Sequence, residues 1–283
     1  MIDVDGGSQP AAGLGALLGA GRTAEVFAWG EGEVLKLLRT GFPERLGERE
    51  AAVAVMVAGM PVAAPRFGGT TRVDGRLGLV YELLRGPSML DGVAARPWEI
   101  DRGARRFAEL HAAMHRADGT GLPDQREDLR HMIDRARDSL PAGARDAALA
   151  RLDALPAAWA VCHGDMHPGN VIVTPRAEVV IDWETATCGN PAGDVARTLF
   201  LLRHGSAPDH LPRLRLGLIE IAKRHFASTY LRRYRRLRRV DDRELAAWRL
   251  PVLAARLGEG IADEREALIA LIKREAGLHR GAG

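Results

Sequence analysis

The spacing of hydrophobic positions changes character near residue 86. Before it, short apolar runs alternate with turn residues, which predicts strands over 26–29, 34–38 and 77–84. The composition of residues 44–58 instead favours a helix. These segments together predict a small lobe that is built from a β-sheet and one helix.

Hydrophobic positions recur at helical spacing in the rest of the chain. The segment 97–116 has a proline near its first turn and continues with apolar residues three or four positions apart. Further helices are expected at 129–140, at 144–155 and from Asp194 onward. A glycine-containing loop interrupts this pattern, and it is flanked by strands predicted at 160–162, 171–174 and 179–181.

A Gly-Pro pair separates the two kinds of pattern. Residues 85–88 end the last N-terminal strand and form a candidate hinge. We therefore expect an α+β fold with two lobes. Residues 1–86 would form a small antiparallel sheet with one helix, and residues 87–283 a larger, mainly helical lobe. Binding sites commonly lie in the cleft between two such lobes.

The composition is that of an ordinary globular protein. The chain has 283 residues, of which 46% are hydrophobic and 27% are charged, so it can bury a substantial core. No apolar run reaches the ~18 residues that a bilayer-spanning helix needs, and residues 1–10 lack the basic region of a signal peptide. Two cysteines, Cys162 and Cys188, give no disulfide framework. We expect a cytoplasmic protein without a membrane partner.

Positive charge is concentrated toward the C-terminus. The net charge is only +3, but residues 231–240 hold six arginines. Such a run can bind nucleic acid or a membrane surface. Only Tyr230 and Tyr234 accompany it, which is little aromatic surface for stacking bases. We interpret the run as a solvated helix face whose arginine stems cover apolar neighbours, and we do not expect nucleic acid as a partner.

Two nearby segments hold the residue types that phosphoryl transfer requires. Residues 161–170 read Val-Cys-His-Gly-Asp-Met-His-Pro-Gly-Asn, and residues 181–184 read Ile-Asp-Trp-Glu. In-line transfer needs a carboxylate that orients the attacking hydroxyl, and oxygen ligands that hold Mg²⁺ on the phosphates. Asp165 is the candidate catalytic carboxylate. Asn170 and Asp182 are the candidate Mg²⁺ ligands.

The N-terminal segment holds candidate nucleotide-binding residues. Gly19 and Gly21 would let backbone N–H groups approach phosphate oxygens, although a plain glycine-rich turn also explains them. Lys36 is the only charge in its apolar strand, so a phosphate or an acidic partner would suit it. Glu50 is the leading partner and Glu48 is a competitor. The alternative is a surface lysine whose stem covers apolar neighbours.

The polar residues around Asp165 have competing interpretations. His163 and His167 could be metal ligands, but no third His lies nearby, and the surrounding glycines and proline predict a tight loop. We therefore interpret His163 as a structural hydrogen-bonding residue that holds the loop. Asp194 is either an ordinary helix N-cap or a buried carboxylate that braces the catalytic loop.

His111 and His115 lie one helical turn apart, a spacing that can form a two-ligand metal site. No glutamate stands between them as in the zinc motif His-Glu-x-x-His. We interpret both as packed or surface histidines.

Taken together, these residues resemble the aminoglycoside phosphotransferase/choline kinase-like family, which has the protein-kinase-like fold. The resemblance covers nearly the whole chain. Residues 163–170 match the family's His-Gly-Asp-x-His-x-x-Asn loop, and residues 181–184 match its metal-binding Asp segment. Residues 190–194 look like its Pro-x-x-Asp element, and residues 110–112 like its Leu-His-Ala helix.

The resemblance implies that ATP binds between the two lobes. The residues implied on the nucleotide side are Gly19, Gly21, Thr23, Lys36, Glu50, Glu82 and Leu84. Lys36 would touch the α- and β-phosphates and pair with Glu50, while backbone groups around residues 82–84 would meet the adenine.

The resemblance also assigns the acceptor side of the cleft. Asp165 would act on the substrate hydroxyl, and Asn170 and Asp182 would hold Mg²⁺. His163 and Asp194 would support the loop. The helices after Asp194 would form the pocket for the acceptor.

The expected function is ATP-dependent transfer of the γ-phosphate to a hydroxyl of a small molecule, such as an aminoglycoside-like antibiotic, an amino alcohol or a sugar. Because the C-terminal part is basic, a neutral or anionic acceptor is favoured over a polycation. Two other classes stay open, a non-catalytic nucleotide-binding regulator of the same fold and a nucleic-acid-binding protein. The presence of Lys36, Asp165, Asn170 and Asp182 together argues against the regulator.

Overall fold

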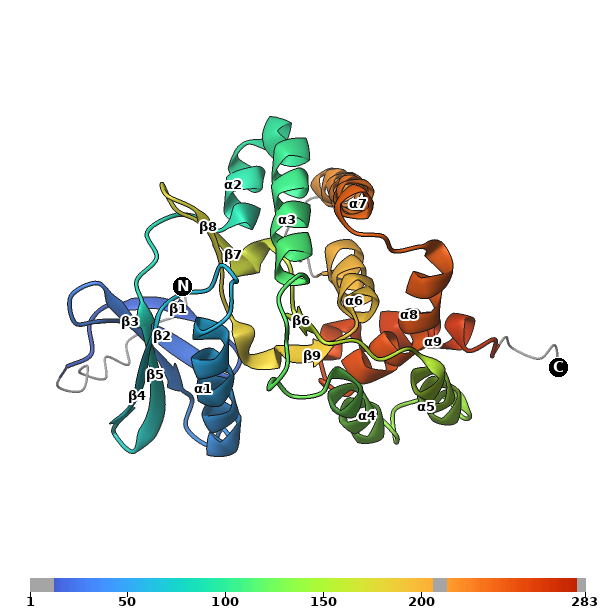
Figure 1. Ribbon diagram of the computed structural model, residues 1–283, viewed down its shortest axis with the longest axis horizontal. Helices are drawn as coiled ribbons and strands as arrows, with labels where there is room; N and C mark the ends of the chain where they lie inside the picture. Colours follow the sequence, from blue (N-terminus) through green and yellow to red (C-terminus); the bar gives the residue numbers. More distant parts are fainter. Residues whose placement is uncertain (1–12, 206–212, 279–283) are drawn as a thin grey trace.

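The computed structural model describes residues 13–205 and 213–278. Figure 1 shows a β-sheet and helix α1 on one side of the molecule and most of the helices on the other, with short strands between them. The expected α+β fold, an N-terminal antiparallel sheet with one helix followed by a larger helical region, is confirmed.

The N-terminal sheet has five antiparallel strands in the order β1-β2-β3-β5-β4. The strands are β1 Leu17–Ala20, β2 Ala24–Trp29, β3 Glu33–Leu38, β4 Phe67–Val73 and β5 Arg76–Glu82. Two expectations need correction. Gly19 lies inside β1 and not in a loop, and β5 ends at Glu82, so that Leu84 lies beyond the sheet.

Helix α1, Glu44–Ala58, packs against the sheet on one side and the helical region on the other. Gly47 is close to the sheet, where an added Cβ atom would lie 2.6 Å from the Cδ1 atom of Leu38. Val53 and Val57 are buried in the same hydrophobic cluster as the C-terminal helices. The helix therefore connects the two parts of the molecule through apolar contacts, and Glu50 lies between these contacts.

The helical region contains eight further α-helices within the described residues. They are α2 Met89–Ala95, α3 Ile100–Met114, α4 Gln125–Arg135, α5 Ala144–Ala154, α6 Pro191–His204, α7 Arg213–Leu237, α8 Asp242–Leu257 and α9 Arg265–Glu275. Helix α4 begins earlier than expected because the Asp124 side chain caps it, accepting from the N–H groups of Arg126 and Glu127. Helix α2 was not predicted.

Two small antiparallel sheets lie between the N-terminal sheet and the helices. One pairs β6 Ala160–Cys162 with β9 Thr187–Gly189, and the other pairs β7 Val171–Val173 with β8 Glu178–Val180. Strands β6, β7 and β8 match the prediction closely, whereas β9 was missed. The predicted hinge packs on β7, since a Cβ atom on Gly86 would lie 2.0 Å from the carbonyl oxygen of Val173.

One large hydrophobic cluster fills the helical region. Its largest fully buried side chains include Phe107 of α3, Tyr230 and Tyr234 of α7, and Trp248 of α8. Both cysteines are free thiols, with Cys162 buried and Cys188 half-buried. None of the helices in the described ranges combines the length and the apolar character needed to cross a bilayer.

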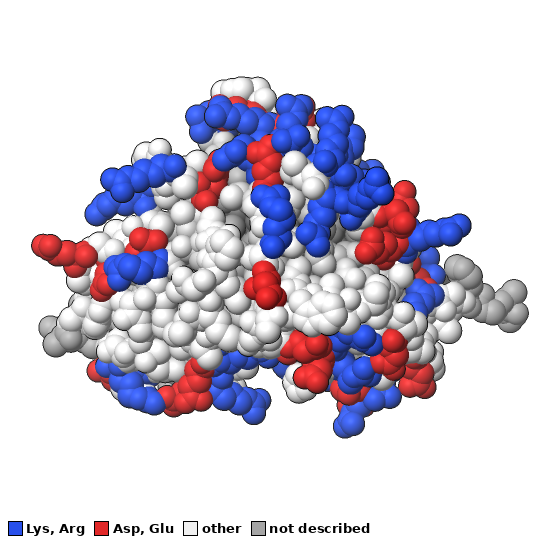
Figure 2. Space-filling model, in the orientation of Figure 1, with Lys and Arg blue, Asp and Glu red and all other residues white. Residues whose placement is uncertain are grey.

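The arginine run at 231–240 covers the end of α7 and the three residues that follow it. Figure 2 shows basic side chains gathered over α2, α3 and α7. Within the run, Arg233 donates to Glu109 of α3 at 2.7 Å, and Arg235 pairs with Asp242 at the start of α8. Two of the arginines thus join neighbouring helices through ion pairs. That nucleic acid is not a partner stays a prediction.

Candidate active site

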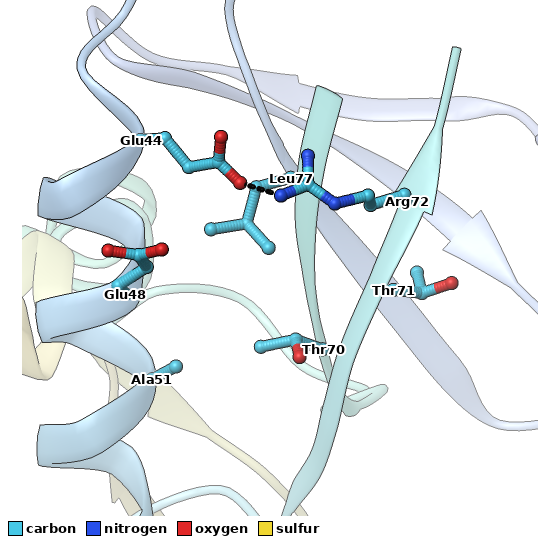
Figure 3. A pocket seen from close by; sticks show the side chains of 7 residues that line it. All are labelled: Glu44, Glu48, Ala51, Thr70, Thr71, Arg72 and Leu77. Atoms are coloured by element: carbon cyan, nitrogen blue, oxygen red, sulfur yellow. Dashed lines mark hydrogen bonds and ion pairs between the residues drawn. The ribbon is translucent and has the colours of Figure 1, made fainter. Parts of the chain in front are cut away.

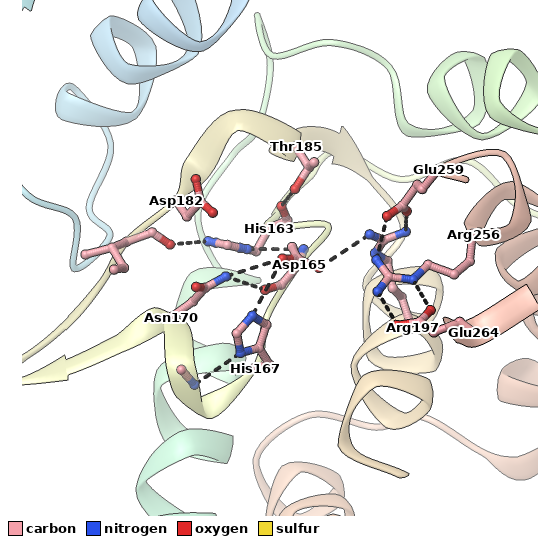
Figure 4. A network of polar contacts seen from close by, with 12 residues as sticks. His163, Asp165, His167, Asn170, Asp182, Thr185, Arg197, Arg256, Glu259 and Glu264 are labelled. Atoms are coloured by element: carbon pink, nitrogen blue, oxygen red, sulfur yellow. Dashed lines mark hydrogen bonds and ion pairs between the residues drawn. The ribbon is translucent and has the colours of Figure 1, made fainter. Parts of the chain in front are cut away.

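The loop between β6 and β7 holds the predicted catalytic carboxylate and one predicted metal ligand side by side. The Nδ2 atom of Asn170 donates to the backbone carbonyl of Asp165 at 3.0 Å and to its Oδ2 atom at 3.4 Å. A 3-10 turn over Pro168–Asn170 brings the two residues together. Figure 4 shows both side chains within a network of polar contacts.

His163 holds this loop through both ring nitrogens. Its Nδ1 atom accepts from the N–H of Asp165 at 3.2 Å, so the ring proton lies on Nε2, which donates to the carbonyl of Ile181 at 3.1 Å. Burial lowers the pKa of His163, which favours this neutral form. The next residue, Gly164, has φ +78, and an added Cβ would lie 2.5 Å from the carbonyl oxygen of Thr185. The loop is shaped by its backbone, as predicted.

Asp194 braces the catalytic loop from α6. Its carboxylate is 1% exposed and accepts the backbone N–H groups of His163 at 2.6 Å and Gly164 at 2.9 Å. The alternative, an ordinary N-cap, is wrong. Asn190 is the N-cap, because its side chain accepts from the N–H of Ala192 at 2.9 Å.

His111 and His115 also donate to Asp194. Their Nε2 atoms lie 3.1 and 3.2 Å from its Oδ2 atom, and their Nδ1 atoms face the hydroxyls of Tyr230 and Tyr234 at 2.8 and 2.6 Å. An ionised carboxylate only accepts, so each Nε2 carries the proton and each tyrosine donates to Nδ1. These side chains could geometrically hold a metal ion. Because hydrogen bonds already satisfy them, we interpret the histidines as packed, as predicted.

The buried His115 should make stability depend on pH. Burial lowers the pKa of His115 from 6.5 to about 4, and the neighbouring His111 adds to the effect. Between these values only the unfolded chain binds the proton, so the free energy of unfolding should fall as the pH drops from 6.5 to 4. Between pH 7.5 and pH 5 the loss from His115 should approach about 2 kcal/mol. Urea denaturation at pH 7.5 and pH 5 measures it.

The variant His115→Phe isolates this residue. It should be less stable than the wild type at pH 7.5 because Asp194 and Tyr234 each lose a hydrogen-bond partner. Its stability should nevertheless fall less between pH 7.5 and pH 5. His131→Gln, at an exposed position, should keep the wild-type pH dependence. An equal pH dependence in wild type and His115→Phe would contradict the assignment.

Lys36 joins the N-terminal sheet to the segment after β8. Its Nζ atom lies 2.9 Å from Oε1 of Glu50, 2.7 Å from Oδ1 of Asp182 and 3.5 Å from Oε2 of Glu184. The predicted Lys36–Glu50 pair is present, and the competitor Glu48 is exposed. Burial alone would lower the pKa of Lys36, but the three carboxylates raise it, so the amine stays charged.

Asp182 sits in an unusual backbone conformation. Its φ of 65 and ψ of 60 are left-handed values that residues other than glycine seldom adopt. Glu184, two residues later, was quoted in the sequence motif but given no role. Burial raises the pKa of Glu184 to about 7 against the attraction of Lys36. Glu184 is thus a third carboxylate near Lys36, in addition to Asp182 and Glu50.

The glycine segment lies beside Lys36 across the sheet. Gly19 pairs with Val26, and Val26 pairs with Lys36, so the three occupy one row across β1, β2 and β3. Among the residues that the structure describes, no atom outside Gly19 and its two chain neighbours lies within 4 Å of a Cβ added to Gly19. Gly21 begins the turn, and its N–H donates to the carbonyl of Ala24 at 2.8 Å.

The other residues implied on the nucleotide side lie at the ends of strands. Thr23 is in the β1–β2 turn, where its carbonyl accepts from Arg39 at 2.9 Å. Glu82 ends β5, and its side chain accepts from the N–H of Arg66 at 2.9 Å. Leu84 follows two residues later. Their contact with a nucleotide stays a prediction.

A largely buried arginine beside Asp165 was missed by sequence reasoning. The Nη2 atom of Arg197 lies 3.4 Å from Oδ1 of Asp165. Burial alone would raise the pKa of Asp165, but Arg197, His167 and His163 hold it below its usual range. Because burial also lowers the pKa of His167, Arg197 is the cation that persists at neutral pH. Its position one helical turn after Asp194 is the signal that could have revealed it.

The donor set near Asp165 fits Mg²⁺. Because Nδ2 of Asn170 donates to Asp165, its Oδ1 atom is the oxygen that remains for a cation. The Asp182 carboxylate is partly exposed and has a second oxygen beyond the one that faces Lys36. Mg²⁺ prefers such hard oxygen ligands and keeps several waters or phosphate oxygens besides.

The geometry assembles the parts that phosphoryl transfer uses. It combines a partly exposed carboxylate, an amide and a second carboxylate that can hold a cation, and a charged lysine from the opposite side. Phosphoryl transfer needs positioning and charge stabilisation more than covalent help from the protein.

A separate cavity lies between α1 and β4, the edge strand of the N-terminal sheet. Its volume is about 420 Å³, and Glu44 and Glu48 of α1 face Thr70 and Arg72 of β4 across it (Figure 3). None of the predicted site residues lines it. We therefore assign it no part in the chemistry.

The fold is shared with phosphotransferases of known structure. An aminoglycoside-3'-phosphotransferase of type VIII is 22% identical, with coverage of 88% of this chain and 91% of that chain and a TM-score of 0.55. A choline/ethanolamine kinase family protein from Mesorhizobium loti is 18% identical, with coverage of 98% and 90% and a TM-score of 0.55. The ADP-bound aminoglycoside phosphotransferase APH(2'')-Ib is 16% identical, with coverage of 95% and 93% and a TM-score of 0.55.

These structural likenesses show a kinase-like fold at low sequence identity. A search of curated proteins found no match to the chain. The sequence profile of the phosphotransferase enzyme family matches residues 16–229, which include every predicted site residue. The chain therefore belongs to the phosphotransferase enzyme family.

Proposed function

We propose that this protein is a Mg²⁺- and ATP-dependent kinase that transfers the γ-phosphate to a hydroxyl group of a small molecule. Residues 1–86 would form its nucleotide-binding lobe, and residues 87–283 its catalytic and acceptor-binding lobe. Membership of the phosphotransferase family supports the reaction class. The acceptor classes that we consider are aminoglycoside-like antibiotics, amino alcohols and sugars.

One observation carries the proposal. Lys36, from the sheet, lies 2.7 Å from Asp182, and the backbone N–H of Ile181 donates to the carbonyl of Asn170 at 2.9 Å. Lys36 is therefore connected to the predicted metal ligands, and through them to the loop that holds the predicted base. A plain surface lysine and an unrelated polar loop would not need this arrangement.

The residues support a division of roles in the reaction. Asp165 would orient the acceptor hydroxyl and take its proton as the new P–O bond forms and the bond to the β-phosphate oxygen breaks, releasing ADP. Lys36 would bind the α- and β-phosphates, with Glu50 holding its amine in place. Mg²⁺, held by Asn170 and Asp182, would neutralise charge on the phosphates.

Measurement of ADP release tests the reaction class. The protein would be incubated with Mg-ATP and a panel of aminoglycosides, macrolides, amino alcohols, sugars and hydroxy acids, with GTP as a second donor. We expect at least one acceptor to stimulate ADP release, and EDTA to abolish it. Mg-ATP binding without stimulation by any acceptor would favour the non-catalytic regulator instead.

Lys36→Met should weaken the use of ATP more than the use of the acceptor. A charge-assisted contact to phosphate is worth enough to raise KM for ATP about tenfold or more when it is lost. KM for the acceptor should stay within about twofold, because the role proposed for Lys36 is contact with the phosphates of ATP and not with the acceptor. Steady-state kinetics with each substrate varied in turn measures both constants.

Two further variants control for the fold. Lys36→Met leaves Glu50 buried without its cation, so the double variant Lys36→Met/Glu50→Met removes the whole pair. Lys273→Met changes an exposed lysine of α9 and should retain wild-type kinetics. An unchanged KM for ATP in a folded Lys36→Met protein would refute the role given to Lys36.

A further inference from the structure

Five charged side chains alternate in sign from Asp165 into the helical region. Arg197 contacts Asp165 at 3.4 Å and Glu259 at 2.6 Å, and Arg256 contacts both Glu259 and Glu264. Figure 4 shows this chain of contacts running from the catalytic loop to the end of α8. The proposed phosphoryl transfer gives no role to the four residues that follow Asp165 in this series, which are Arg197, Glu259, Arg256 and Glu264.

These charges are largely withdrawn from water. The side chains of Arg197 and Arg256 are 12% and 10% exposed. Removing ions from water costs free energy that the ion pairs only partly return, so an apolar core would serve stability equally well. In addition, the buried Nε atom of Arg197 has no hydrogen-bond partner among the described residues. In the orientation that contacts both Asp165 and Glu259, the guanidinium of Arg197 therefore leaves its Nε–H group without a hydrogen bond to any part of the chain that the structure describes.

Arg197 stands where it can act on the catalytic loop. It follows Asp194 by one turn of α6, so both side chains project from the same face of that helix. Asp194 holds the backbone of the loop at His163 and Gly164. Arg197 holds its reactive side chain at Asp165.

We propose that Arg197 is a positioning residue that fixes the orientation of the Asp165 carboxylate for the acceptor hydroxyl, and that Glu259 in turn fixes Arg197. This inference rests on the proposed function and deepens it. Oδ1 of Asp165 faces Arg197, while Oδ2 faces Nδ2 of Asn170 at 3.4 Å. Contacts from both sides restrain rotation of the carboxylate.

The unequal distances give Glu259 its role. Arg197 is closer to Glu259, at 2.6 Å, than to Asp165, at 3.4 Å. A close two-pronged pair between Arg197 and Asp165 would occupy the oxygens that must receive the hydroxyl. Glu259, which Arg256 and Glu264 hold in place, keeps the guanidinium near enough to orient Asp165 but too far to sequester it.

Kinetics on the full-length protein tests this arrangement with the best acceptor from the ADP-release panel. Arg197→Met should lower kcat about 10²-fold, as small misplacements of reacting groups do. Arg197→Lys should recover part of the loss. Glu259→Gln should lower kcat about tenfold in the presence of Arg197, and by nothing further in the Arg197→Met background. The Kd for Mg-ADP should stay near the wild-type value in every variant. Because Arg197→Met removes one of the two arginines that pair with Glu259 and should lower the melting temperature, kcat is compared at a temperature at which every variant is folded.

Matched comparisons separate positioning from a general structural role. Arg203→Met, at an exposed position on the same helix, should leave kcat unchanged. In an Asp165→Asn background, Arg197→Met should add little, because its effect passes through Asp165. Equal losses in both backgrounds, or wild-type kcat in Arg197→Met, would overturn the inference while leaving the kinase assignment intact. A wild type that releases no acceptor-dependent ADP would overturn the kinase assignment itself, and this inference with it.

Discussion

Asp165→Asn should lower kcat about 10³-fold while leaving nucleotide binding intact. The amide keeps the size of the carboxylate and can still contact Asn170, but it cannot accept the proton of the acceptor hydroxyl. It also loses the charge that Arg197 faces at 3.4 Å. ADP release with a saturating acceptor gives kcat, and calorimetry gives the Kd for Mg-ADP, which should change by less than about twofold.

The control for this variant is an exposed aspartate. Asp138→Asn changes a side chain that is 92% exposed, and it should behave as the wild type. Equal ADP release by Asp165→Asn and the wild type across the acceptor panel would mean that another group takes the proton. A loss of nucleotide binding together with kcat would instead point to damage in the whole loop.

Asp194→Ala should destabilise the protein by about 3–5 kcal/mol. The substitution leaves four buried donors without an acceptor, the N–H groups of His163 and Gly164 and the Nε2 atoms of His111 and His115. Natural domains are stable by only about 5–15 kcal/mol, so a large part of the stability would be lost. Urea denaturation followed by circular dichroism measures the free energy of unfolding.

A second variant separates charge from volume at this position. Asp194→Asn preserves the shape, but its Nδ2 hydrogens would face donors, so it should lose most of the same free energy. Asp146→Ala, whose side chain is 85% exposed, should change stability by less than about 0.5 kcal/mol. If Asp194→Asn were as stable as the wild type, the size of the side chain at this position would matter for stability and its negative charge would not.

The parts of the site that sequence reasoning predicted are those encoded in short segments. Asp165 and Asn170 lie five positions apart in one loop, where glycines and a proline restrict the backbone. Lys36 stood out because it is the only charge in an apolar strand, and such a residue needs a partner. Its pairing with Glu50 followed from the same reasoning, and the structure confirms it at 2.9 Å.

The missed parts depend on residues far apart in the chain. Arg197 and Glu259 are separated by 62 positions, and His111 and Tyr230 by 119. Only the packing of α3, α6, α7 and α8 brings these side chains together. From the sequence alone, an arginine in an amphipathic helix is most simply explained as a solvated side chain.

Strand β4 was missed for a local reason. Gly68 and Gly69 lie near its start, and glycine is depleted in strands because it brings no side chain to pack. The strand nevertheless forms at the edge of the sheet, where its register against β5 shifts between Phe67 and Gly69. Gly69 has φ +111, a value that glycine tolerates. The glycines thus mark an irregular edge strand, not the absence of one.

Helix α1 lies before the proposed boundary near residue 86, but it contacts residues on both sides of that boundary. The same helix supplies Glu50 to the lysine of the sheet and buries Val53 and Val57 in the cluster that contains Trp248 and Tyr230. A fragment cut at that boundary would expose these valines to water and leave a gap in the C-terminal core. The proposed boundary would therefore divide the chain by the ligands that each part binds, whereas the hydrophobic cluster of the helical region also contains residues of α1 from before that boundary.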